Sequence, residues 1–228
     1  MKEKHILPSC TPLVLLVFVT ASLSGCAWFK SRQVETAEQL AAEGMAYFDE
    51  EDYGEALEKF TTLKERYPYS RYAILAELKV ADAHFHREEY PEAIAAYEDF
   101  ARLHPKNEAI PYVLYQIGAS YYEQLLSSDR DQTPTYQAIL AFERLIKAHP
   151  NSTYAKKAEA KVQLCRKLLA AHEMYVGRFY YKSKHYEAAL LRCEGVLASY
   201  QDALSEKERK EVEELIQSCK VKLSETIE

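Results

Sequence analysis

The sequence predicts an all-α fold, a superhelical solenoid of four to five helical hairpins, and three observations support this prediction. A set of small and aromatic positions recurs along residues 44–200, most often at an interval of 37 residues, as between Gly44, Ala81 and Gly118. The small and aromatic positions lie three residues apart, which places them on one face of a helix. Proline and serine recur at the expected helix boundaries. An interval of roughly 20–50 residues is typical of stacked repeats.

Each repeat combines a first helix and a second helix that approach closely. The first helix carries a small residue followed three positions later by an aromatic or histidine side chain: Gly44 and Tyr47, Ala81 and His84, Gly118 and Tyr121, Gly177 and Tyr180. The second helix carries alanine followed by a larger residue: Ala56 and Phe60, Ala93 and Tyr97, Ala138 and Phe142, Ala189 and Cys193. We expect the two small residues to face each other. The pattern resembles the tetratricopeptide repeat.

The helix boundaries follow from capping residues and prolines. Pro68, Pro105 and Pro150 end second helices, because proline cannot continue the hydrogen-bond ladder. Ser70 and Ser152 occupy predicted N-cap positions, and Pro111 suits a first helical turn. The polar residues 127–134 predict a longer loop in the third repeat. Residues 153–183 predict one long or bent helix, and residues 206–227 predict an amphipathic helix that caps the array.

The N-terminal residues predict a lipoprotein signal. A short basic start precedes an apolar run of about nine residues, which is too short to span a bilayer. The run Leu23-Ser24-Gly25-Cys26 that follows resembles the lipobox of bacterial lipoproteins; an ordinary signal with a chance cysteine is the alternative. We therefore expect a signal peptide at 1–25, a lipidated tether at 26–35 and a repeat domain at 36–228. Because Ala27 stands where bacterial lipoproteins retained at the inner membrane carry Asp, this resemblance implies the periplasmic face of the outer membrane, with a lipid anchor on Cys26.

Composition argues against several functions. The net charge of −6 and the absence of a basic run argue against a nucleic-acid partner. Beyond the signal and Cys26, the remaining cysteines are widely spaced, which argues against a metal site: Cys165, Cys193 and Cys219. Cys193 and Cys219 are expected to approach each other, either bonded or as buried free thiols. No nucleophile and base pair can be nominated, so we expect no enzyme activity, no cofactor and no metal.

Large aromatic residues one position after the repeat's aromatic core position predict a peptide groove. These residues are Phe48, Phe85, Tyr122 and Tyr181, and Met45, Leu78 and Tyr115 are expected near them. Apolar side chains beside polar rims are typical of surfaces that bind peptides. The alternative is that some of these residues only pack between neighbouring repeats.

Two stretches carry a more specific resemblance. One reads Tyr67-Pro68-x-Ser70-x-Tyr72-Ala73 and continues to His104-Pro105; the other begins at Leu169-Ala170-x-x-Glu173 and ends at Arg192-x-x-x-Val196-Leu197. With the lipobox and the repeat spacing, they resemble the BamD (ComL) family, lipoproteins of the machine that inserts β-barrels into outer membranes. Two departures are Gln201 in place of a proline after Tyr200, and a short C-terminus of about one helix. They leave the contacts of the family's last hairpin open.

The resemblance implies a function for each half of the repeat domain. The N-terminal repeats would bind unfolded outer membrane protein clients, and the C-terminal repeats would dock the periplasmic domains of the barrel-forming subunit. Arg192 matches the family's arginine in the second stretch, lies on a second helix away from the small-residue seam, and is the candidate docking residue. The alternative is another envelope lipoprotein built on the same repeats, acting in the assembly of pili or of the cell wall.

Overall fold

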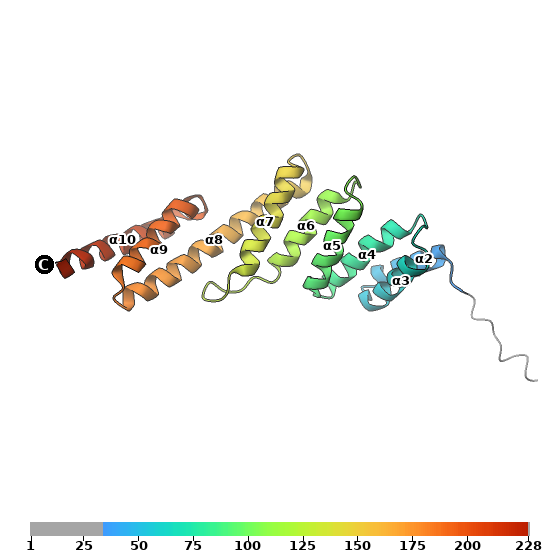
Figure 1. The fold of residues 1–228 in the computed structure, drawn as a ribbon, viewed down its shortest axis with the longest axis horizontal. Helices are drawn as coiled ribbons and strands as arrows, with labels where there is room; N and C mark the ends of the chain where they lie inside the picture. Colours follow the sequence, from blue (N-terminus) through green and yellow to red (C-terminus); the bar gives the residue numbers. More distant parts are fainter. Residues whose placement is uncertain (1–33, 228) are drawn as a thin grey trace, which may run out of the picture. The chain divides into compact units, whose positions relative to one another are not determined.

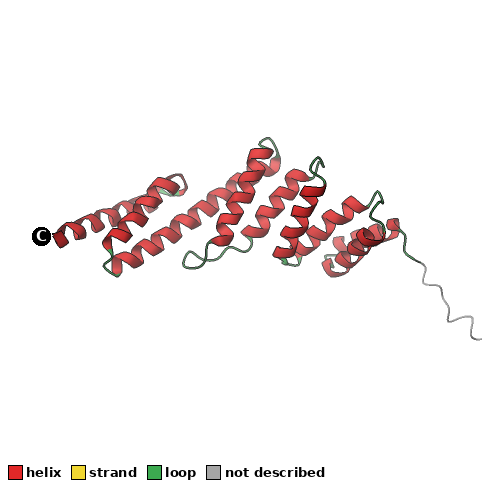
Figure 2. Cartoon of the chain, in the orientation of Figure 1, coloured by secondary structure: helices red, strands yellow, loops and turns green. Residues whose placement is uncertain are grey.

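The computed structural model describes residues 34–227, and every regular element in that range is a helix (Figures 1 and 2). Residues 37–228 form one compact unit. The predicted all-α class is therefore confirmed. Its elements are α2 (Ala37–Asp49), α3 (Tyr53–Arg66), α4 (Ala73–His86), α5 (Tyr90–Leu103), α6 (Ile110–Tyr122), α7 (Thr133–Ala148), α8 (Thr153–Lys182), α9 (Tyr186–Tyr200), the 3-10 helix η2 (Gln201–Ala203) and α10 (Glu206–Ile227).

Each described helix packs mainly on the helices before and after it in the chain, as the ribbon in Figure 1 shows. The pairs α2–α3, α4–α5, α6–α7 and α8–α9 form four hairpins, and α10 packs on α9. Such nearest-neighbour packing is the defining property of a solenoid. The predicted repeat organisation is confirmed, and both the long helix and the terminal helix lie where the sequence predicts them.

The seam inside each hairpin is built by a small residue against a larger one. A Cβ atom added to Gly44 would lie 2.9 Å from the ring of Phe60, and one added to Gly118 would lie 2.5 Å from the ring of Phe142. Both rings are fully buried. The closest neighbour of each glycine is therefore the ring on the second helix, whereas the sequence analysis named the alanine as its counterpart. The glycine makes room for a ring that fills the hairpin core.

The two predicted serine caps behave differently. Ser152 is the N-cap of α8, and its hydroxyl accepts a hydrogen bond from the backbone N–H of Ala155 at 3.0 Å. Ser70 is not an N-cap: its hydroxyl accepts from the N–H of Tyr72, and α4 begins only at Ala73. The prediction for Ser70 was wrong because the chain makes an extra turn there, which moves the start of the helix beyond the reach of this side chain.

Three hairpins close with the same turn. Glu51, Glu88 and Lys184 each adopt a positive φ of 60–62°, a conformation that favours glycine. The next backbone N–H in each turn reaches back five residues to a helix carbonyl: Asp52 to Tyr47, Glu89 to His84 and His185 to Tyr180. This is the Schellman arrangement. The third hairpin instead has a loop at residues 123–132, and α7 already includes Thr133 and Pro134, which the sequence analysis assigned to the loop.

Candidate protein-binding surfaces

The four aromatic residues predicted to line a groove lie at the C-terminal ends of α2, α4, α6 and α8, and all four are half-buried. In the three hairpins with the common turn, the ring packs edge-on against the first residue of the following helix. The pairs are Phe48 with Tyr53 (ring centroids 5.2 Å apart), Phe85 with Tyr90 (5.8 Å) and Tyr181 with Tyr186 (5.5 Å). Each ring is thus fixed by its own turn while part of it stays accessible, and we call Phe48, Phe85, Tyr122 and Tyr181 the aromatic ladder.

Lysines from neighbouring helices cover two rings of the ladder. The Nζ atom of Lys79 lies 4.0 Å from the ring centroid of Phe48, and that of Lys161 lies 3.6 Å from the centroid of Tyr122. These distances are within the range of cation–π interactions. One face of each of these rings is therefore already occupied, and a ligand would meet the remaining edge together with a positive charge.

The three residues predicted near the ladder are also half-buried, and they contribute to the apolar core. Met45 packs against the core of the first hairpin, and Leu78 packs against the core formed by α4–α8. Tyr115 lies 5.7 Å from Phe142 on α7 and 5.7 Å from Tyr154 on α8, measured between ring centroids. Tyr115 thus contacts both adjacent helices, which is the arrangement described by the alternative of packing between repeats.

A buried carboxylate joins three helices, and sequence reasoning missed it. Asp82 on α4 is 3% exposed and accepts hydrogen bonds from the hydroxyls of Tyr97 on α5 and Tyr112 on α6, both at 2.7 Å. The Nζ atom of Lys79 donates to it at 3.0 Å, and Gln116 donates to Tyr112. Burial, followed by the charge of Asp82, raises the pKa of both tyrosines. The two hydroxyls therefore remain protonated donors over the physiological range.

The sequence contains one signal for this cluster. Asp82 follows the small residue Ala81 directly and stands in a helix whose neighbouring positions are mostly alanine and valine. A charged residue in such a helix requires a buried partner, because an unpaired buried charge is costly. The partner tyrosines come from two other helices, so the pattern within α4 alone could not identify them.

Arg192 on α9 is engaged within the chain. Its guanidinium forms an ion pair with Glu173 on α8, with an N–O distance of 2.9 Å, and the hydrogen bond that Arg192 donates to Glu173 raises the pKa of Arg192. The Cβ of Arg192 lies 3.6 Å from the position of a Cβ added to Gly177. The prediction that Arg192 lies away from the small-residue seam was therefore wrong. The side chain is still 44% exposed, so its outer N–H groups can reach another carboxylate.

Two tyrosines complete the surroundings of this ion pair. Burial raises the pKa of Tyr200 to about 12, and a hydrogen bond with Tyr136 and the charge of Glu173 act in the same direction. Tyr136 lies on α7 and is 46% exposed, and the guanidinium of Arg166 lies 5.7 Å from the ring centroid of Tyr200. The ion pair therefore belongs to a partly exposed cluster of aromatic and charged groups where α7, α8 and α9 meet.

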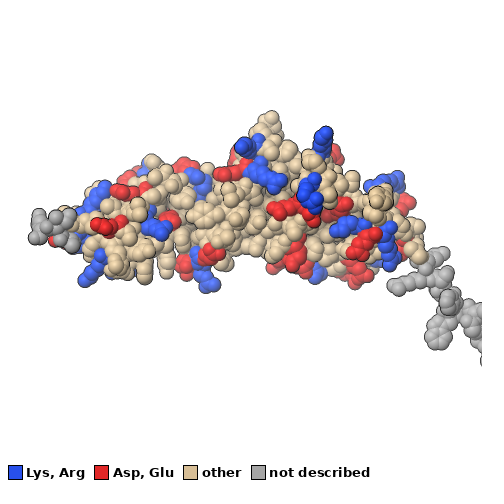
Figure 3. Space-filling model, in the orientation of Figure 1, with Lys and Arg blue, Asp and Glu red and all other residues tan. Residues whose placement is uncertain are grey.

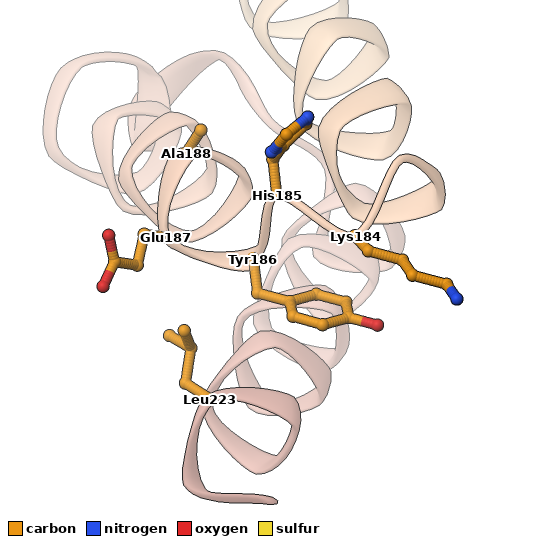
Figure 4. A pocket seen from close by; sticks show the side chains of 6 residues that line it. All are labelled: Lys184, His185, Tyr186, Glu187, Ala188 and Leu223. Carbon is orange, nitrogen blue, oxygen red and sulfur yellow. The ribbon is translucent and has the colours of Figure 1, made fainter. Parts of the chain in front are cut away.

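The turn between α8 and α9 forms one side of an open hollow of about 570 Å³ (Figure 4). Lys184, His185 and Tyr186 line it from the turn, and Leu223 closes it from α10. In the close-up, the ring of Tyr186 lies between Lys184 and Leu223. The residues lining the hollow mix charged and apolar groups, as a surface that contacts another protein does.

The histidines and cysteines have structural surroundings. Nδ1 of His84 lies 2.8 Å from Glu89, whereas His86 stacks on Tyr53, so the two histidines of α4 point to different partners. Within residues 34–227, no group of three or more potential ligands is placed to hold a metal ion. Three cysteines are buried free thiols: Cys165, Cys193 and Cys219. Burial, and after it the nearby Cys219, raise the pKa of Cys193 to about 11, consistent with the predicted proximity of these two residues.

The predicted signal peptide, Cys26 and most of the tether lie outside the described residues. Among the helices that are described, none is both long enough and apolar enough to cross a bilayer.

Residues 33–219 match the protein-family model YfiO, described as an outer membrane lipoprotein. Three relatives are each named outer membrane protein assembly factor BamD. The relative from Rickettsia prowazekii is 34% identical over 191 residues (83% of this chain, 76% of the relative), and that from Neisseria meningitidis serogroup A is 33% identical over 207 residues (83% and 78%). The relative from Caulobacter vibrioides is 31% identical over 196 residues (82% and 63%), so this chain spans less than two thirds of its length.

A solved tetratricopeptide repeat protein from Parabacteroides merdae covers 79% of this chain at 12% identity, with a TM-score of 0.31. That score is too low to support the fold, which rests on the four hairpins described above.

Proposed function

We propose, from the premise that this chain belongs to the BamD (YfiO) family of outer membrane lipoproteins, that it is a scaffold and client-binding subunit of the outer membrane protein assembly complex. In this role it is an assembly factor and not an enzyme. A lipid on Cys26 would hold it at the periplasmic face of the outer membrane. Its partners would be unfolded barrel clients and the barrel-forming subunit with periplasmic domains.

The observation that best supports client binding is the aromatic ladder. Phe48, Phe85 and Tyr122 lie at equivalent ends of successive first helices and stay partly accessible. Unfolded barrel strands alternate apolar and polar residues and carry aromatic residues that have no partner before insertion. Aromatic pairs contribute roughly 0.5–1.5 kcal/mol beyond burial. A few such contacts would give weak and reversible capture, which suits a subunit that passes its client on.

The test is a titration of a labelled peptide from the C-terminal strand of a barrel protein, with melting curves for each variant. We expect Phe85→Ala to weaken binding while costing less stability than a core phenylalanine truncation, which costs about 3–5 kcal/mol. Tyr69→Ala is the matched control, because Tyr69 is fully exposed in the loop before α4. If Phe85→Ala melts like a core variant and binds the peptide normally, the ladder is packing and the client site lies elsewhere.

Docking of the barrel-forming subunit is proposed for the cluster around Arg192. An arginine can add a second carboxylate partner because its five N–H groups point in several directions. We expect Arg192→Glu to weaken capture of that subunit. Glu173→Gln separates the two roles of the residue: it removes the internal ion pair and leaves Arg192 in place. Normal capture by Glu173→Gln supports direct docking, whereas equal loss in both variants would show that the ion pair matters only for the local structure.

The anchor is tested separately from both binding surfaces. We expect Cys26→Ala to leave an uncleaved or soluble periplasmic form, since the thiol that would carry the lipid is gone. Unchanged mass and unchanged membrane fractionation of this variant would contradict the proposed anchor and leave the two protein-binding proposals untouched.

A further inference from the structure

The first helix of each later hairpin has a face that packs on the preceding hairpin. In α4 this face comprises four residues that are at most 6% exposed: Ala73, Ala76, Val80 and Ala83. Ala76 and Val80 belong to the core formed with α2 and α3. The equivalent residues of α6, 37 positions later, are also buried: Ile110, Val113, Ile117 and Ser120. We call these four positions the stacking face, and in both hairpins the preceding second helix packs against the helix that carries it.

The long helix α8 carries the stacking face twice. Its first copy is Ala155, Ala158, Val162 and Cys165, all buried, and the last three belong to the same core as Phe142 and Leu145 of α7. Alignment of Gly177 with Ala81 places a second copy 14 residues later, at Leu169, His172, Val176 and Phe179. Fourteen residues are close to four turns of an α-helix, so both copies lie on nearly the same side of α8.

The second copy is apolar and incompletely covered. Leu169 is buried, His172 and Val176 are half-buried, and Phe179 is 60% exposed. In α4 and α6 the position of Phe179 is held by Ala83 and Ser120, which are both fully buried. The loop between α6 and α7 reaches this copy at His172, whose Nδ1 lies 2.7 Å from a carbonyl oxygen of that loop.

One further exposed apolar residue continues this surface along α8. Tyr175 is 51% exposed and lies one helical turn before Phe179. Figure 3 shows a broad area with few charged side chains along part of α8. Large apolar side chains exposed together mark an interaction site more often than a tolerated surface.

The two halves of α8 each lack one neighbour, and the side chains at the two gaps differ. The first half has no second helix of its own, and the hollow there is lined by polar side chains together with small apolar ones: Lys156, Glu159, Gln163, Ala160 and Val162. The second half lacks a preceding second helix, and there the side chains are Val176 and the large ring of Phe179, which is 60% exposed. Apolar side chains gain free energy from being covered, so this gap favours an occupant.

We propose that the second stacking face of α8 docks an amphipathic helix of a partner protein, whose apolar stripe covers Val176 and Phe179. In this chain, helices α3, α5 and α7 pack on the helices that bear the other copies of the face, so its shape suits a helix. The face itself is apolar at Leu169, Val176 and Phe179, so its occupant must present an apolar stripe. A helix in a groove is an established mode of peptide recognition.

The test uses the full chain in nanodiscs of zwitterionic lipid and a fluorescein-labelled helical peptide of the same 16-residue length as α7. The peptide has a leucine and alanine stripe along one face, and a control peptide has the same composition in a scrambled order without the stripe. We expect the amphipathic peptide to bind more tightly than the scrambled one, and Phe179→Ser to weaken its binding about fivefold or more. Leu191→Ser on α9 is the matched control, because Leu191 is 72% exposed, and it should bind normally.

Four outcomes would overturn the proposal. They are absence of binding by the amphipathic peptide, equal binding of the two peptides, binding that Phe179→Ser leaves unchanged, and equal weakening by Leu191→Ser. Two further measurements test other occupants. Dimerisation that Phe179→Ser abolishes would assign the face to a second copy of this chain. Loss of peptide binding when the nanodiscs contain phosphatidylglycerol would assign it to anionic lipid.

Discussion

The two halves of α8 present equivalent positions to different surroundings. In the first half Cys165 is fully buried in the core that includes α7, whereas in the second half the equivalent residue, Phe179, is 60% exposed. The local helical structure is the same in both halves. The difference is tertiary: α7 packs on the first copy of the stacking face, and the second copy continues beyond it. Equivalence in a repeat pattern therefore predicts which face a residue occupies but not whether that face is covered.

The comparison also shows how a repeat array accommodates extra residues. The two copies of the stacking face are 14 residues apart, which is close to a whole number of helical turns. The added segment extends α8 by about 21 Å without rotating the face away from its neighbours. An addition of two residues fewer would rotate the second copy by about 200°, and Gly177 would no longer face α9. A nearly integral number of turns lets one helix serve two repeats.

Cys165 and Phe179 occupy equivalent positions in the two halves of α8, and exchanging their residue types should give the largest difference in stability between two variants. We expect Cys165→Phe to destabilise the protein by about 1–3 kcal/mol or more, because the larger ring must enter a close-packed core. Phe179→Cys should change stability by no more than about 0.5 kcal/mol, since the ring is mostly solvated. Urea unfolding followed by circular dichroism measures both. Equal destabilisation by the two variants would mean that the second copy of the stacking face is as well covered as the first. The two halves of α8 would then not differ in burial.

Two glycines allow a similar comparison, because one lies against a buried ring and the other faces open space. Gly118→Ala should lower stability by about 1–2 kcal/mol, since its new Cβ would meet the buried Phe142 ring at 2.5 Å and the overlap outweighs the better helix propensity of alanine. A Cβ added to Gly195 on α9 would meet no atom within 4 Å. Gly195→Ala should therefore stabilise by about 0.5–1 kcal/mol. The melting temperatures of the two variants test these expectations. If Gly118→Ala stabilised the protein, the Phe142 ring would have to shift easily.

The start of α8 can be compared with the start of α4. Ser152→Ala removes a side-chain cap and should cost about 1 kcal/mol. Ser70→Ala removes a hydrogen bond in a turn before the helix and should cost about half of that or less. The ratio of the two free-energy changes, from chemical denaturation, is the quantity of interest. A larger cost at Ser70 would mean that its turn controls the start of α4 despite lying outside the helix.

Acid should have the smallest effect. Hydrogen bonds from Arg87, and then from His84, lower the pKa of Glu89 from 4.5 to about 2. A carboxyl group with a lowered pKa stabilises the fold above its unfolded value of 4.5, and this contribution is lost as the pH falls towards 2. The stability difference between wild type and Glu89→Gln should therefore shrink between pH 5 and about pH 2. The measurement is thermal melting at low salt. A stability difference between wild type and Glu89→Gln that stays constant over that pH range would argue against hydrogen bonds to an ionised Glu89.

Local signals account for what the sequence could predict. The spacing of small and aromatic residues placed all four hairpins, and the long apolar pattern placed α8 and α10 nearly to the residue. The four residues of the aromatic ladder lie at equivalent helix ends, and their role in peptide binding stays a prediction. The missed features depend on distant segments: the partners of Asp82 come from two other hairpin helices, Arg192 meets Glu173 across a hairpin, and the exposure of Phe179 depends on where α7 ends. The prediction that Ser70 caps α4 was wrong for a local reason, because an extra turn separates Ser70 from the start of the helix.

The buried Asp82 cluster has a consequence for how the array unfolds. In a solenoid, stability is approximately a sum of repeat and interface contributions, and units can melt separately. Asp82 accepts hydrogen bonds from α5 within its own hairpin and from α6 in the next one. Opening of either neighbour would remove one of the tyrosine donors to this buried carboxylate, so we expect α4, α5 and α6 to exchange their amide hydrogens as one cooperative block, and Asp82→Asn to loosen that coupling. Separate exchange of α4 and α6 in the wild type would contradict this expectation. If the three helices do open together, the middle of the array is its most rigid part, and the two ends can move relative to it.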